Sequence, residues 1–283
     1  MNMKAVDVSV IMPCFNDGRY IQEAIESVDL IRNKETEIII VDDGSTDSLT
    51  KSILSQLSDE RIRIIHADHG GPSAARNLGI ENARGSYILP LDADDRIEPE
   101  YIETALNILK NNPRVGVVYC HADLFGEETG MWKLPDYSFE RMLIQSLVFV
   151  TAMFRKEDWS AIGGFRTDMK HGMEDYDFFI GMLAFGKEIY QLPEVLFHYR
   201  IKNSSRTTAF LKESSHVKEA FQQIYEHHQE FYQKNAKLYA CLLRAELIQE
   251  QYEKQRLIQA NQMILRIKRI APINWLVKRV LRK

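Results

Sequence analysis

Three acids follow an apolar segment in the first third of the chain. Asp92-Ala93-Asp94 comes directly after residues 87–91. If those residues form a strand, the side chains of Asp92 and Asp94 point to the same side. Carboxylate oxygens of this kind bind Mg²⁺ or Mn²⁺ together with substrate phosphates. A solvated turn is the alternative, because Asp is common in turns. The third acid, Asp95, is predicted to cap the helix that follows.

A second pair of acids, Asp42 and Asp43, follows the apolar residues 38–41. A carboxylate at this place can accept a hydrogen bond from a nucleobase N–H or a ribose hydroxyl. A capped turn is the alternative, since Asp43-Gly44-Ser45 is good turn chemistry. Two acidic clusters at one edge of a sheet repel each other unless a cation or ligand compensates them. This crowding favours a binding site.

Two helix starts offer groups for a phosphate and for a hydroxyl. Arg76 and Asn77 follow Gly70-Gly71 at the start of a predicted helix, which suits a phosphate or an acidic neighbour. An exposed helix arginine is the alternative. Glu174 and Asp175 begin another predicted helix, where a carboxylate can act as the general base that activates a hydroxyl. Acids there also complement the helix dipole, by about 0.3–1 kcal/mol, and this is the alternative interpretation.

The segment from His198 to Arg206 combines cations with turn-forming residues. His198 could ligate a metal ion and Arg200 could bind a phosphate. A flexible loop that closes over a diphosphate has this composition. A surface loop with a packed histidine is the alternative.

These residues need a framework, and the first half of the chain alternates apolar β-rich segments with helical patterns. The pattern predicts strands at 8–12, 37–41, 62–66, 87–91 and 115–120, and helices at 20–28, 46–57, 72–83 and 99–109. Residues 38–41 are apolar throughout, as expected when helices cover both faces of a parallel sheet. The sequence therefore predicts an α/β layer fold. Ligands bind beyond the carboxyl ends of such strands, where both acidic clusters fall.

The second half of the chain is less regular. It predicts a buried strand at 148–154, a helix at 174–185 and a short strand at 188–191. From 214 to 262 the sequence is helical and polar.

Composition and charge narrow the function classes. The 283 residues are 45% hydrophobic and 27% charged, which is ordinary for a globular protein. The net charge is −4, but residues 264–283 carry seven Lys or Arg and no acid, so the rest of the chain carries −11. This distribution argues against nucleic-acid binding. Three scattered cysteines favour a reducing compartment, and the lack of a signal peptide or a long apolar run predicts a cytoplasmic protein.

Together these segments resemble the family-2 glycosyltransferases with a GT-A fold. The matching segments occur in the family's order, at 8–16, 39–47, 71–77, 92–94, 163–165 and 174–175. The resemblance covers about residues 7–206. It implies a GT-A-type, Rossmann-like mixed sheet flanked by helices over residues 1–210, followed by a helical C-terminal extension over 211–283.

The resemblance also implies roles for individual residues. The donor would be bound by Pro13, Phe15, Asn16, Asp42, Asp43, Arg76, Asp92 and Arg200. Asp94 would ligate Mn²⁺ or Mg²⁺, and Asp175 would be the catalytic base with Glu174 beside it. The family often has a histidine two positions after the Tyr-Arg pair, where this chain has Lys202. His198, as a metal ligand, or Lys202 would then replace that contact.

The implied reaction is an inverting transfer of a sugar from a nucleotide-diphosphate sugar, a UDP sugar, to a hydroxyl of a cell-envelope glycan or lipid-linked saccharide. A non-catalytic scaffold or a nucleotide-sugar-binding protein on the same fold is the alternative. A Rossmann dehydrogenase is excluded because no G-x-G-x-x-G follows the first strand.

The basic amphipathic end, 264–283, predicts contact with an anionic membrane surface. The protein would then be peripheral on the inner face of the membrane. A helix docked on the protein body is the alternative.

Overall fold

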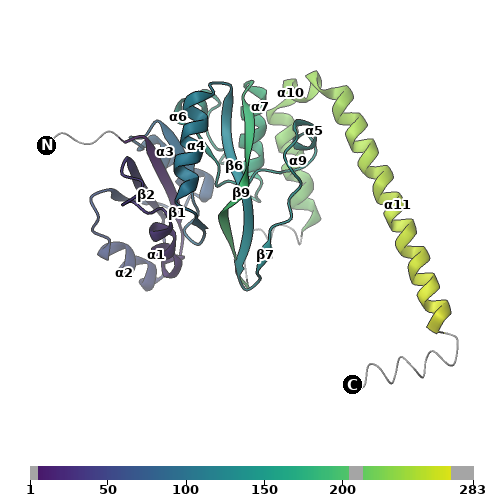
Figure 1. Ribbon diagram of the computed structural model, residues 1–283, viewed down its shortest axis with the longest axis horizontal. Helices are drawn as coiled ribbons and strands as arrows, with labels where there is room; N and C mark the ends of the chain where they lie inside the picture. Colours follow the sequence, from purple (N-terminus) through teal and green to yellow (C-terminus); the bar gives the residue numbers. More distant parts are fainter. Residues whose placement is uncertain (1–5, 204–212, 269–283) are drawn as a thin grey trace. The chain divides into compact units, whose positions relative to one another are not determined.

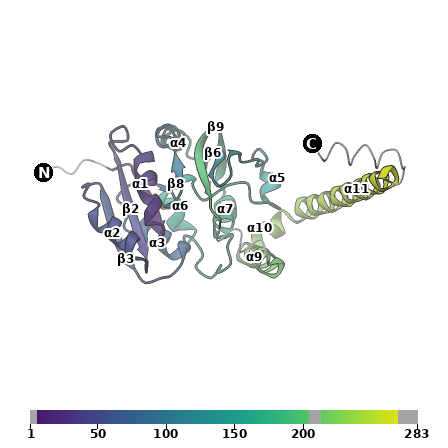
Figure 2. The ribbon, with the colours of Figure 1, turned by 90° about the horizontal axis from the view of Figure 1, so that it is seen from below.

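The computed structural model describes residues 6–203 and 213–268, and its main feature is a mixed sheet flanked by helices (Figure 1). The strands are β1 Val8–Cys14, β2 Thr36–Asp43, β3 Ile62–Ala67, β4 Tyr87–Pro90, β5 Arg96–Ile97, β6 Val115–Gly126, β7 Gly130–Met131, β8 Met153–Arg155 and β9 Glu188–Ile201. The helices are α1 Gly18–Ser27, α2 Ser48–Gln56, α3 Pro72–Glu81, α4 Glu100–Asn111, α5 Phe139–Met142, α6 Lys156–Ala161, α7 Glu174–Ala184, α9 Ser214–His227, α10 Gln229–Lys234 and α11 Ala236–Lys268. Figure 2 shows α4 on one side of the sheet and α7 on the other.

The strand order explains why the sheet is mixed. It runs β3-β2-β1-β4-β8-β6-β9-β5, with β7 paired to β6. The first four of these strands are parallel. Strand β8 is antiparallel to both β4 and β6, whereas β9 is parallel to β6 and antiparallel to β5. The predicted α/β fold with a mixed sheet flanked by helices is confirmed.

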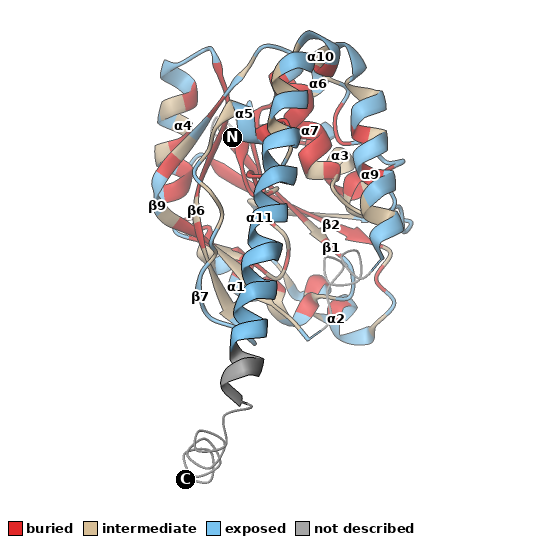
Figure 3. Cartoon of the chain, turned by 90° about the vertical axis from the view of Figure 1, so that its right-hand side faces the viewer, coloured by how far each residue is buried: buried red, intermediate tan, exposed pale blue. Residues whose placement is uncertain are grey.

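Strand β2, inside the parallel half of the sheet, is covered on both faces. All eight residues of β2 are buried, as the apolar segment 38–41 predicted (Figure 3). Helix α3 lies very close to β1 at Gly79. A Cβ atom added at this glycine would come within 2.5 Å of Ile11 Cγ2. Only glycine allows this approach.

The strand register brings the functional segments to one edge of the sheet. Cys14 at the end of β1 pairs with Asp42 in β2. Strand β4 ends beside β1, with Ile11 opposite Pro90, so the loop holding Asp92 and Asp94 starts at the same edge. On the far side, Arg96 of β5 pairs with His198 of β9. This pairing brings the end of β9 to the loop after β4.

Two predicted elements differ from the structure. The short strand expected at 188–191 continues through Ile201, so His198 and Arg200 lie on β9 and not on a loop. The strand is extended because it pairs with β6 on one side and with β5 on the other. The strand expected at 148–154 is limited to the three residues of β8.

Helix α9 packs against α7 through a buried carboxylate. Asp177 Oδ1 lies 2.8 Å from His227 Nδ1 and 3.1 Å from His228 Nε2, and the aspartate is 2% exposed. Both histidines therefore help to hold the helix that begins with Glu174 and Asp175.

The chain divides into two compact units, one up to Gln233 and one from Lys234 onward. The boundary at residue 210 stays a prediction. The second unit contains α11, whose side chains are mostly exposed as far as Met263 (Figure 3). Apart from the last turn of α11, the basic segment 264–283 lies outside the described residues. Within the described ranges, no helix is both long and apolar enough to cross a membrane.

Candidate active site

Asp43 anchors the loop that leads into α3. Its two carboxylate oxygens accept hydrogen bonds from the backbone N–H groups of Gly70 (2.8 Å) and Gly71 (3.0 Å). His69 Nδ1 lies 2.9 Å from Asp43 Oδ2, and the His69 ring stacks on the ring of Phe15 with centroids 4.3 Å apart. Phe15 is 42% exposed. Phe15 and Asp43 thus meet at His69, where an aromatic face and polar groups can hold a planar base.

Asp42 stabilises the turn after β2. It accepts a hydrogen bond from the backbone N–H of Ser45 (2.9 Å) and lies 3.0 Å from His66 Nδ1. Burial acts to raise the pKa of Asp42, but the hydrogen bonds from Ser45 and His66 outweigh it and leave the pKa below its usual value. The carboxylate is therefore ionised.

Asn16 fastens the loop after β1 to the loop after β2. Its Oδ1 accepts hydrogen bonds from the backbone N–H groups of Thr46 (2.8 Å) and Asp47 (3.1 Å). Its φ of 57° lies in the left-handed region, which asparagine tolerates better than most residues. Pro13 lies in β1 beyond the last residue that pairs with β4, so its missing N–H costs no hydrogen bond there.

Arg76 joins three segments of the site. It is 3% exposed, and its guanidinium donates to Asp92 Oδ1 (2.8 Å) and to Glu174 Oε1 (3.0 Å). The guanidinium carbon also lies 5.8 Å from the centre of the Phe165 ring. Burial acts to lower the pKa of Arg76, but Asp92 and Glu174 outweigh it and raise the pKa. Arg76 is a fixed positive charge between the loop after β4 and the start of α7.

Asn77 holds the turn that contains Phe165. Its Nδ2 donates to the Phe165 carbonyl (2.8 Å), and its Oδ1 accepts from the Phe165 N–H (2.9 Å) and from Trp159 Nε1 (3.2 Å). A Cβ atom added at Gly164 would come within 2.9 Å of Asn77 Oδ1, and the φ of Gly164 is 74°. Arg76 and Asn77 thus hold neighbouring segments in place: Arg76 through Asp92 and Glu174, and Asn77 through the turn at Phe165.

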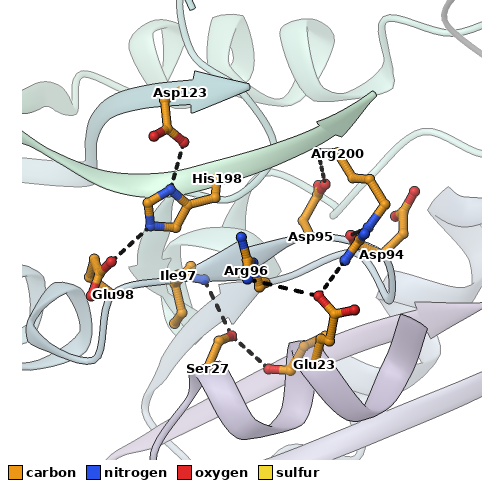
Figure 4. Close-up of polar contacts among 11 residues, drawn as sticks. Glu23, Ser27, Asp94, Asp95, Arg96, Ile97, Glu98, Asp123, His198 and Arg200 are labelled. Atoms are coloured by element: carbon orange, nitrogen blue, oxygen red, sulfur yellow. Dashed lines mark hydrogen bonds and ion pairs between the residues drawn. The ribbon is translucent and has the colours of Figure 1, made fainter. Parts of the chain in front are cut away.

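Arg200 binds the loop after β4 (Figure 4). Its backbone N–H donates to Asp95 Oδ1 (2.8 Å), its Nε donates to the Asp94 carbonyl (2.7 Å), and its Nη2 donates to Glu23 Oε2 (2.7 Å). Arg200 was predicted to bind the donor; the structure places its side chain against protein groups.

The prediction that Asp95 caps the following helix is wrong. The cap position of α4 belongs to Pro99. Asp95 is 2% exposed and is used to fix the end of β9, because it accepts the Arg200 N–H. Burial and the neighbouring carboxylate of Asp94 raise the pKa of Asp95 well above its usual value.

His198, predicted as a metal ligand, lies between two carboxylates (Figure 4). Its Nδ1 is 2.6 Å from Asp123 Oδ1 and its Nε2 is 3.0 Å from Glu98 Oε1. Both ring nitrogens thus have partners on β6 and on the segment before α4.

The Asp94 carboxylate has a cationic neighbour. Its Oδ2 lies 2.7 Å from the Nζ of Lys202, and that Nζ also lies 3.1 Å from both carboxylate oxygens of Asp17. Burial and the nearby Asp92 raise the pKa of Asp94, whereas Lys202 opposes this effect.

A divalent metal ion suits the chemistry of these residues. Asp92 and Asp94 offer hard oxygens at one strand end, and the observed ammonium shows that Asp94 already binds a cation. Across the described parts of the chain, no three His, Cys, Asp or Glu side chains form a group that could hold a metal ion. Water molecules and phosphate oxygens of a substrate would complete the coordination, as they do in many Mg²⁺ sites.

Asp175 is the second residue of α7, and its half-buried side chain accepts a hydrogen bond from the backbone N–H of Tyr176 (2.8 Å). Met173, which directly precedes Glu174 and Asp175, has a φ of 67°. Two of the three non-glycine residues with positive φ in the described chain, Asn16 and Met173, therefore lie beside the site. Such outliers are concentrated at functional sites.

Two residues that contact the predicted site residues were not predicted from the sequence. His69 supports both Asp43 and Phe15, and its position directly before Gly70-Gly71 was the available signal. Asp17 pairs with Lys202, and no local pattern connects residues so far apart in the sequence.

The comparisons with known proteins identify the family of the chain. The sequence model described as "Glycosyl transferase family 2" matches residues 9–186, which is more than half of the chain. The chain therefore belongs to glycosyl transferase family 2, a family of transferases.

Individual relatives are similar over different lengths. An uncharacterized glycosyltransferase of Rickettsia felis is 47% identical over 105 residues, which are 37% of this chain and 17% of that protein. The uncharacterized glycosyltransferase RP339 of Rickettsia prowazekii is 33% identical over 218 residues, 73% of this chain and 67% of the relative. The crystal structure of S. aureus TarS 1–349 in complex with UDP-GlcNAc has a TM-score of 0.60 and 20% identity, covering 72% of this chain and 61% of that one. At this identity the likeness shows the shared fold.

Replacing Arg76 with lysine tests its bridging role. Lysine keeps the charge but lacks the fork that reaches Asp92 and Glu174 together. We expect the free energy of unfolding in urea to fall by about 1.5–3 kcal/mol, the value of one hydrogen bond to a charged group. The control is Arg114→Lys, because Arg114 is 85% exposed and pairs weakly with Glu188. Equal stabilities of the two variants would contradict the bridging role.

Proposed function

We propose that this chain is an inverting glycosyltransferase that moves a sugar from a UDP sugar to an acceptor hydroxyl. The observation that carries the proposal is the bridge of Arg76 between Asp92 and Glu174. This bridge holds the strand edge where a donor would bind against the start of α7, which carries Asp175. Family membership supports a transferase, and the UDP-GlcNAc in the TarS structure of the same fold favours a UDP sugar.

The donor would lie along the edge formed by the loops after β1, β2 and β4. Its base would stack near Phe15 and contact the Asp43 region, and its diphosphate would reach Asp92 and Asp94. A bound Mn²⁺ or Mg²⁺, held by Asp94 with Asp92 nearby, would stabilise the negative charge of the leaving diphosphate.

Asp175 would act as the general base. The acceptor hydroxyl gives its proton to this carboxylate while the hydroxyl oxygen forms a bond to the anomeric carbon. The bond from that carbon to the diphosphate oxygen breaks, and the diphosphate leaves with the electron pair. Attack from the side opposite the leaving group inverts the configuration.

Asp175→Asn tests the base. The amide cannot accept the proton, so we expect the transfer rate to fall by at least about 10²-fold while UDP-sugar binding persists. Release of UDP on addition of acceptor measures transfer, and calorimetry measures binding. Glu81→Gln, which alters an exposed acid at the end of α3, is the control. Unchanged turnover in Asp175→Asn would refute the assignment, and donor binding by the wild-type chain without any UDP release would favour a nucleotide-sugar-binding protein.

Removal of divalent metal tests the cofactor. We expect EDTA to abolish transfer, because the leaving diphosphate lacks charge compensation without a metal ion. Added Mn²⁺ or Mg²⁺ should restore transfer. The measurement is UDP release before and after dialysis. Full activity in EDTA would show that Asp94 does not act through a metal ion.

We also propose that the acceptor is a cell-envelope glycan or a lipid-linked saccharide and that residues 264–283 bind an anionic membrane surface. The seven basic residues of that segment motivate this proposal. Truncation after Met263 should abolish sedimentation with phosphatidylglycerol vesicles, whereas neither chain should sediment with phosphatidylcholine vesicles. If the truncated chain keeps both vesicle binding and activity, the membrane role of the segment is wrong.

A further inference from the structure

Lys202 directly follows β9 and connects two loops of the site. Its Nζ lies 2.7 Å from Asp94 Oδ2 and 3.1 Å from each carboxylate oxygen of Asp17. Asp17 belongs to the loop after β1 and Asp94 to the loop after β4. The lysine side chain is 19% exposed, so this ammonium group is largely withdrawn from water.

The surrounding charges explain why an ammonium group is held there. Asp92, Asp94 and Asp95 follow one another at the end of β4, and like charges this close are unfavourable without a cation. The Lys202 ammonium group lies between the carboxylates of Asp94 and Asp17, and this pairing favours its charged form. Arg200 contacts the Asp94 carbonyl and Glu23, which leaves the Asp94 carboxylate to Lys202.

The same carboxylate is the one expected to bind a metal ion. A metal ion and an ammonium group held against one carboxylate repel each other, so the two cations compete for Asp94. Lys202 nevertheless has a second partner. If Asp94 is taken by another cation, the ammonium keeps both contacts with Asp17 and is not left unpaired in a partly buried place.

We propose that Lys202 is an internal counter-ion that a divalent metal ion has to displace from Asp94, so that this lysine sets the metal affinity of the site. The inference rests on the proposed metal role of Asp94. Without metal, Lys202 neutralises the acidic edge and ties the loop after β1 to the loop after β4. With metal, the lysine is paired with Asp17 alone and remains a positive charge beside the position of the diphosphate.

A titration with Mn²⁺ alone tests this competition. The signal of free Mn²⁺ in electron paramagnetic resonance gives the affinity of the full chain without any nucleotide or turnover. We expect Lys202→Met to bind Mn²⁺ about tenfold more tightly than the wild type, because the cation that competes for the Asp94 carboxylate is removed. Lys187→Met is the matched control, because Lys187 is also 19% exposed and pairs with a carboxylate, Asp158, at the other end of β9. Its Mn²⁺ affinity should equal that of the wild type.

The outcomes separate this inference from the proposed function. Asp94→Asn should lose Mn²⁺ binding in both the wild-type and the Lys202→Met background. Equal Mn²⁺ affinity of the wild type and Lys202→Met, with binding lost in Asp94→Asn, would overturn the role of Lys202 and leave the metal site intact. If Asp94→Asn binds Mn²⁺ like the wild type, or if no chain binds it, the metal role of Asp94 fails and the inference fails with it. Lys202→Gln, checked by thermal unfolding, replaces the methionine variant if that chain does not fold.

Discussion

Arg76 is almost fully buried, with the carboxylate of Asp92 on one side and that of Glu174 on the other. A buried guanidinium is tolerated only when anions and hydrogen-bond acceptors compensate it, and a buried carboxylate has the complementary need. Helix α3, the loop after β4 and the start of α7 therefore have to come together for any of these charges to be stable. The edge that would receive a donor and the helix that carries Asp175 are positioned by the same group.

Buried carboxylates elsewhere around the site are stabilised by hydrogen bonds, and each of these bonds connects segments that are distant in sequence. Asp95 accepts the N–H of Arg200 at the end of β9, and Asp43 accepts two N–H groups of the loop before α3. Asn77 does the same with neutral groups at Phe165. Many polar residues that look like ligand groups in the sequence thus hold the loops in place.

This division explains how far the sequence could be interpreted. The apolar segment 38–41 predicted β2 and a parallel sheet, because a strand that is buried on both faces is apolar throughout and does not alternate apolar with polar residues. The acids at the end of β2 and after β4 predicted the candidate functional edge, because each acidic pair directly follows an apolar segment in the sequence. By contrast, the contact of Asp95 with Arg200 depends on the pairing of β9 with β5 and β6, which are distant in the chain. No local pattern encodes that register, so the cap assigned to Asp95 was wrong.

Asn16 accepts hydrogen bonds from Thr46 and Asp47, and its own N–H donates to Ser45 Oγ. The connections after β1 and β2 consequently form one rigid element with two chain segments. Exchanging only one of them with a homologous protein would leave an amide or two N–H groups without partners. Loop grafting at this edge of the sheet should therefore transfer residues 13–18 and 42–47 as a pair.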